Sequence, residues 1–168
     1  MFRKYLDLLY ALSGAIGALF LVMIGLLMLS QMLARAFGFQ IRGVDDLTAW
    51  SVAATAMLSL AYAFRKGAHI RVTILIGGRS ANVRRIYELV CLLVSAVMAF
   101  ILAYASLKLT YDSWQYKEIA MGSLRVPLWI PQTSMCVGAF IFFIAIIDDF
   151  FAVMCGKNPS YSGNNDGI

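Results

Sequence analysis

The chain has 168 residues and a formal net charge of +5, and 61% of its residues are apolar while only 14% are charged. An average soluble domain is about 45–50% apolar and about 25% charged, and a soluble protein of this size could not bury so much apolar surface. The composition therefore excludes an ordinary soluble domain and indicates that a lipid bilayer surrounds most of the chain. The cations lie in short segments between apolar runs, where topology determinants lie, so the charge is not a nucleic-acid signal.

The first long apolar run, Leu8 to Ala34, contains 27 residues without a charge. About 20 residues are enough to span a bilayer, and a cleavable signal peptide has a shorter apolar core, so we expect an uncleaved first helix. Gly14 and Ala18 form a small-xxx-small pair on one face of this helix. Such pairs let two helix backbones approach closely, so this pair predicts packing and not function.

The second apolar run extends from Leu47 to Phe64, and Asp45 and Asp46 precede it. Carboxylates at a helix N-terminus can cap free amides and interact favourably with the helix dipole, which is the structural interpretation of this pair. Within the run, hydroxyl side chains recur at steps of three and four and therefore share one helical face. They can bond to carbonyls of their own helix or form a polar seam against another helix, and the two interpretations are compatible. This hydroxyl face consists of Thr48, Ser51, Thr55 and Ser59.

The central segment, residues 65–85, holds six cations, no acid and the only histidine, His69. Two further apolar runs follow it, and Pro127 suits the first turn of the last one. That run ends at Asp148 and Asp149, where the helix dipole disfavours anions, so the pair needs a cationic partner or water. We considered His69 and Arg71 as candidate partners.

These runs predict an all-α membrane protein with four transmembrane helices. Residues 1–156 form a single four-helix transmembrane domain, with spans at about 8–34, 45–64, 86–109 and 126–150. Residues 157–168, rich in Asn, Gly and Ser, are expected to be a disordered tail. With four spans, both termini share a side with the central segment. That side carries nine cations against five on the other, so the positive-inside rule places both termini in the cytoplasm.

Several functional classes lack their residues in this sequence. One histidine cannot provide bis-histidine haem ligation, and the three cysteines form no metal-ligand spacing. No acidic residue lies inside an apolar run, as the buried carboxylate of a small proton-driven exporter would. We therefore expect neither catalytic, cofactor nor metal residues in this chain.

A set of short motifs resembles the small membrane subunit of tripartite ATP-independent periplasmic (TRAP) transporters, the DctQ-like family. The most specific motif is Gly-x-His-Ile-Arg-Val after the second helix, and the similarity covers roughly residues 34–147. The residues that carry it are Arg35, Asp45, Asp46, Trp50, Gly67, His69, Arg71, Pro127 and Trp129.

The resemblance implies a multi-pass protein of the bacterial inner membrane and a division of labour. A large permease subunit would carry the substrate and sodium sites, and a periplasmic binding protein would capture the substrate, typically an organic acid. The small subunit would brace the large one. An alternative from the residues alone is a self-assembling four-helix transporter or channel.

Overall fold

The computed structural model describes residues 2–66 and 81–155, with side chains from residues 6–66 and 86–155. These residues form four helices: α1 (Phe2–Ala36), α2 (Val44–Arg65), α4 (Ala81–Gln115) and α5 (Trp129–Met154). Each helix is long and apolar enough to cross a membrane. The all-α, four-span prediction is confirmed for the described residues, and every helix extends past its predicted span at one end or both.

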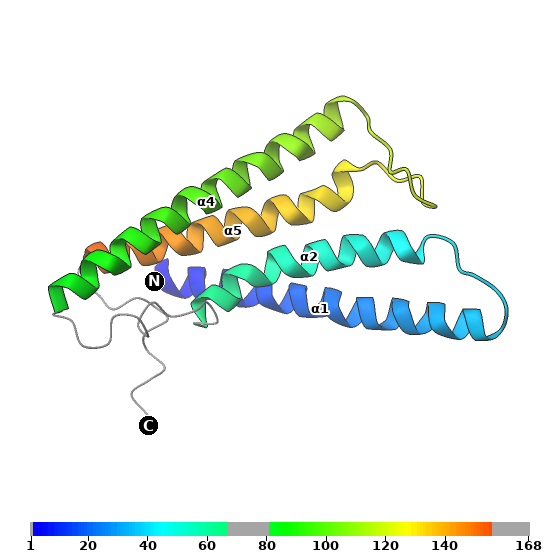
Figure 1. The fold of residues 1–168 in the computed structure, drawn as a ribbon, viewed down its shortest axis with the longest axis horizontal. Coiled ribbons are helices and arrows are strands. Elements are labelled where there is room, and N and C mark those ends of the chain that lie inside the picture. Colours follow the sequence, from blue (N-terminus) through cyan, green and yellow to red (C-terminus); the bar gives the residue numbers. More distant parts are fainter. Residues whose placement is uncertain (1, 67–80, 156–168) are drawn as a thin grey trace, which may run out of the picture.

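The helices lie side by side in the order α1, α2, α5, α4 rather than in a closed bundle (Figure 1). Each helix packs mainly on its neighbours in this row, so α1 and α4 form its two edges. The row consists of two antiparallel hairpins, α1–α2 and α4–α5, which meet along α2 and α5. The start of α1 and the end of α5 lie at the same end of the row (Figure 1).

We name the two ends of the row by their contents. The loop end comprises residues 35–46 and 116–128, which join the helices of each hairpin, and the terminal end comprises residues 6–10, 64–66 and 148–155. At the loop end, Gly38 and Gly43 have φ values of 80° and 86°. Glycine adopts this left-handed backbone without steric cost, which lets α1 end and α2 begin within a short connection.

The start of α5 differs from the prediction. Pro127 lies outside the helix, in an antiparallel bridge with Ile119, and α5 begins at Trp129. The amide of Leu128 donates to the carbonyl of Glu118 at 2.9 Å, and that of Ala120 donates to Val126 at 3.0 Å. Because this short pairing engages the backbone on either side of Pro127, the first helical turn comes after Pro127 and not around it.

Small residues lie where the helices touch. A Cβ added to Gly138 would be 2.6 Å from the backbone carbonyl carbon of Met57, so α2 and α5 approach each other closely at this point. Ala99 and Ala103 of α4 are 2% exposed, whereas large apolar side chains of α1 and α4 point away from the row. In lipid such side chains need no protein partner, and close packing of small residues stabilises helix association instead.

Candidate functional site

The hydroxyl face of α2 packs inside this chain against α1. Ser51 is 2% exposed, and a Cβ on Gly17 of α1 would lie 3.3 Å from the Cβ of Ser59. Ser13 of α1 donates a hydrogen bond to the carbonyl of Leu58. The seam that the spacing indicated is therefore present, and its partner among the described residues is α1.

Most hydroxyls on this face also bond to their own helix. Thr48 donates to Val44 at 2.8 Å, Ser51 to Leu47 at 2.6 Å and Ser59 to Thr55 at 2.6 Å. The two interpretations of the pattern hold together: three of the four hydroxyls bond within α2, and the small side chains permit close packing. Thr55 is partly buried on the same face.

The small-residue pair on α1 is shifted by one position from the one predicted. Gly14 faces α2, where an added Cβ would be 2.7 Å from the ring of Tyr62, and its companion on that face is Gly17. Ala18 is exposed. The step of three from Gly14 keeps residue 17 facing α2, whereas a step of four moves residue 18 away from it.

Asp46 joins the two hairpins at the loop end. Its carboxylate accepts a hydrogen bond from the backbone amide of Leu124 at 3.0 Å, and a Cβ on Gly122 would overlap it. The side chain of Leu124 packs on Gly43, which has no room for a Cβ on that side. These contacts hold the 116–128 connection against the start of α2.

The predicted capping role of the aspartate pair is not what the structure shows. The N-cap of α2 is Gly43, without a side-chain capping hydrogen bond. Asp45 and Asp46 occupy the first helical turn, where their charge still favours the dipole. Asp46 satisfies an amide of a distant segment instead, a role that sequence position alone does not indicate.

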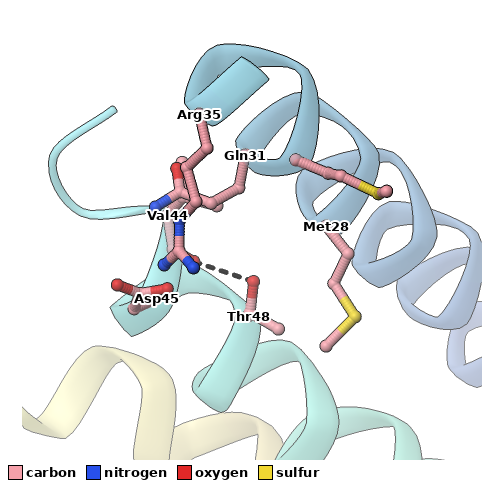
Figure 2. A pocket seen from close by; sticks show the side chains of 7 residues that line it. Met28, Gln31, Arg35, Val44, Asp45 and Thr48 are labelled. Atoms are coloured by element: carbon pink, nitrogen blue, oxygen red, sulfur yellow. Dashed lines mark hydrogen bonds between the residues drawn. The ribbon is translucent and has the colours of Figure 1, made fainter. Parts of the chain in front are cut away.

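A pocket of about 290 Å³ lies at the loop end, between the last turns of α1 and the first turn of α2 (Figure 2). Gln31 and Arg35 extend from α1 toward α2, and Asp45 lies on the same side of the pocket (Figure 2). Arg35 and Asp45 are exposed, whereas Gln31 is 7% exposed. The remaining lining residues are Met28, Met32, Val44 and Thr48.

The terminal end holds an ion-pair cluster that the sequence reasoning did not find. Arg65, at the end of α2, lies 2.9 Å from Asp148 of α5 and 3.1 Å from Asp7 of α1. Its guanidinium also lies over the ring of Tyr10, 4.6 Å from the centroid. The Arg65 side chain is only 12% exposed, and the neighbouring Asp149 is fully buried.

Arg65 is therefore a cationic partner of Asp148, and contact of His69 or Arg71 with the aspartate pair stays a prediction. Gly67, His69 and Arg71 lie outside the described residues. The signal for Arg65 was available in the sequence: it is the first cation after the α2 run, and in an antiparallel arrangement it meets the end of α5. Two other motif residues, Trp50 and Trp129, are partly buried.

These arrangements join helices rather than perform chemistry. Within the described ranges, no group of three His, Cys, Asp or Glu residues could hold a metal ion. The ion pairs of Arg65 and the hydrogen bond to Asp46 lie at the two ends of the row, and each links elements far apart in the sequence.

Comparison with known proteins agrees with this architecture. A search of curated proteins found no match. The family model for tripartite ATP-independent periplasmic transporters, DctQ component, matches residues 23–156, which is most of the chain and includes the C-terminal part of α1 and all of the other helices. The chain thus belongs to the DctQ family and is a small, multi-pass membrane subunit of a TRAP transporter, not an enzyme.

Proposed function

We propose that this chain is the bracing subunit of its transporter and does not itself carry the substrate. In this proposal it holds the static part of a large permease subunit in the inner membrane. The large subunit performs sodium-coupled uptake of an organic acid, which a periplasmic binding protein delivers. Sodium sites are expected in the large subunit, with none in this chain.

The observation that carries the proposal is the placement of charge along the row. Asp7, Arg65 and Asp148 gather at the terminal end, and Asp46 lies at the loop end. The apolar runs between these ends contain no charged residue. Ionisable residues inside a membrane mark ion and substrate pathways. In the described helices, the charged residues named above lie at the ends of the row and bind neighbouring elements instead.

The open row supports the same function. A row one helix thick has two broad faces (Figure 1), and many large apolar side chains of both hairpins are exposed. Such a slab fits against a larger membrane protein on one face and against lipid on the other. The loop end would then offer its fixed connections to the binding protein on the periplasmic side.

The test is reconstitution in liposomes of the chain alone, the large subunit alone and both together, with binding protein and a sodium gradient. We expect the tagged chain to co-purify with the large subunit and uptake to require both. Sodium-driven uptake by the chain alone would overturn the proposal. That result, together with a homo-oligomer in detergent, would instead support the self-assembling transporter.

A further inference from the structure

We propose that the pocket lined by Gln31, Arg35 and Asp45 binds the headgroup of a zwitterionic phospholipid that carries a primary ammonium group, as phosphatidylethanolamine does. This assignment concerns the chain itself and does not depend on the proposed bracing function. Four observations support it: a buried amide, two opposite charges, the depth of the pocket and its size.

The first observation is the amide of Gln31. The side chain is 7% exposed, and neither its Nε2 nor its Oε1 atom has a hydrogen-bond partner among the described residues. A buried amide without partners carries a free-energy penalty, and polar groups in such positions are normally satisfied. A phospholipid satisfies both atoms, because its ester or phosphate oxygens accept from Nε2 and its ammonium donates to Oε1.

The second observation is a pair of opposite charges on the two helices that border the pocket. Arg35 is in the last turn of α1 and Asp45 in the first turn of α2, and both are exposed. Neither takes part in an ion pair within the part of the chain that the structure describes. A guanidinium suits a phosphate and a carboxylate suits an ammonium, each through charge-assisted hydrogen bonds.

The third observation is the depth of the pocket in the membrane. Arg35 directly follows the uncharged run that ends at Ala34, so the polar groups lie at the membrane–water interface. Met32 and Met28 lie about one and two turns deeper than Arg35 and are 73% and 59% exposed. The lining therefore changes from charged to apolar along the direction in which a phospholipid changes from headgroup to acyl chain.

The size agrees with a headgroup rather than a whole lipid. The volume of about 290 Å³ is at the lower end of the range of about 300–1,000 Å³ typical of small-molecule sites. The acyl chains would then lie outside the pocket, along the exposed methionines. An anionic headgroup without an ammonium leaves Asp45 unpaired, and a choline headgroup cannot donate a hydrogen bond to it, so the site should select between lipids.

The experiment is native mass spectrometry of the delipidated full-length chain, with phosphatidylethanolamine, phosphatidylcholine and phosphatidylglycerol of identical acyl chains. We expect phosphatidylethanolamine to be retained about tenfold more strongly than the other two, as the loss of one charge-assisted hydrogen bond implies. Gln31→Leu and Asp45→Asn should reduce its retention to the level of phosphatidylglycerol, whereas Arg35→Gln should lower the retention of all three lipids, because each carries the phosphate. Gln40→Leu and Arg42→Gln are matched controls, because both residues are exposed at the loop end outside the pocket.

A thermal melt separates binding from folding. Gln31→Leu removes a buried amide without partners, so the delipidated variant should melt at or above the wild-type temperature. It should nevertheless lose the rise in melting temperature that phosphatidylethanolamine gives the wild type. Equal retention of the three lipids by the wild type would overturn the proposal, as would lipid selectivity that persists in both Gln31→Leu and Asp45→Asn.

Discussion

Arg65 shows how a single side chain can join three helices of a membrane protein. It contacts α1 through Asp7 and Tyr10, and α5 through Asp148. Its planar guanidinium can satisfy two carboxylates at once and lie over an aromatic ring, which a lysine ammonium cannot do equally well. The cost of burying this charge is offset because its partners lie at the membrane boundary, where Asp7 remains 60% exposed.

Replacing Arg65 with methionine should destabilise the chain by about 2–3 kcal/mol. This is less than the roughly 3–5 kcal/mol for breaking a fully buried pair, because Asp148 is 25% exposed. Unfolding of the detergent-solubilised protein by denaturant measures it. Lys66→Met is the matched control, because Lys66 is exposed and, among the described residues, its ammonium makes only a cation–π contact with Tyr62 at 5.7 Å; it should cost at most about 1 kcal/mol.

Asp148→Asn tests whether the two residues act together. Combined with Arg65→Met, it should cost at least about 0.5 kcal/mol less than the sum of the two single changes, since each single change removes the same contact. Additive losses would show that the pair contributes nothing to stability as a pair.

The two adjacent aspartates of α2 provide a second comparison between residues. Asp46→Ala removes the acceptor of the Leu124 amide and should free the 116–128 connection. Trypsin should then cleave at Lys117 and Arg125 several times faster than in the wild type. Asp45→Ala should not change the cleavage rate, because Asp45 makes no hydrogen bond to this connection in the described structure. Equal acceleration by both changes would mean that the loss of charge, and not the hydrogen bond, loosens the loop.

At the scale of elements, alanine substitutions at two glycines distinguish the effect of close helix packing on stability from the effect of helix propensity. Gly138→Ala places a Cβ against the backbone of Met57, so α2 and α5 must move apart, at a cost of about 1–3 kcal/mol. Gly25→Ala in α1 meets no atom within 4 Å and should be neutral or stabilising by up to about 1 kcal/mol. Unfolding of the two variants in the same detergent checks both values. A neutral Gly138→Ala would mean that the two hairpins do not rely on this contact.

The sequence predicted the helices well because apolar runs in a membrane protein have few alternative structures. The run from Leu8 to Ala34 can only be a helix if lipid surrounds it. The helix ends were less predictable, because α4 continues to Gln115 through polar residues that follow its apolar run. The prediction that Pro127 lies in the first turn of the last helix was wrong for a similar reason. Proline favours a helix start locally, but here the backbone around it pairs with residues 118–120.

The contacts between elements were the least predictable part. The hydroxyl face of α2 was visible from its spacing, but the sequence did not show that α1 covers it. Gly17 is a small residue in the same helix as Gly14. It was overlooked because the small-xxx-small motif pairs Gly14 with Ala18, four residues further on. The roles of Asp46 and Gln31 depend on segments that approach only after folding, so no local pattern contained them.

At the scale of the whole molecule, the orientation of the row in the membrane is a prediction from its charges. The loop end should face the periplasm and the terminal end the cytoplasm, given nine cations against five. In a background without Cys91 and Cys136, cysteines at Gln40 and Ser123 should react with an impermeant maleimide in intact cells. Native Cys155, exposed at the terminal end, should react only after permeabilisation. Labelling of Cys155 in intact cells would reverse the topology.

The two polar contacts on α2 have a mechanical consequence. Asp46 and Arg65 are 19 residues apart, about 28 Å along a helix, which is close to the bilayer's hydrocarbon thickness of about 30 Å. Each ties α2 to the other hairpin, one in each interfacial layer. Because the two hairpins are joined at both ends of α2, neither can slide along the other without breaking the Asp46–Leu124 hydrogen bond or the Arg65–Asp148 ion pair. A partner subunit that moves perpendicular to the membrane would therefore move along a surface whose two hairpins do not shift relative to each other.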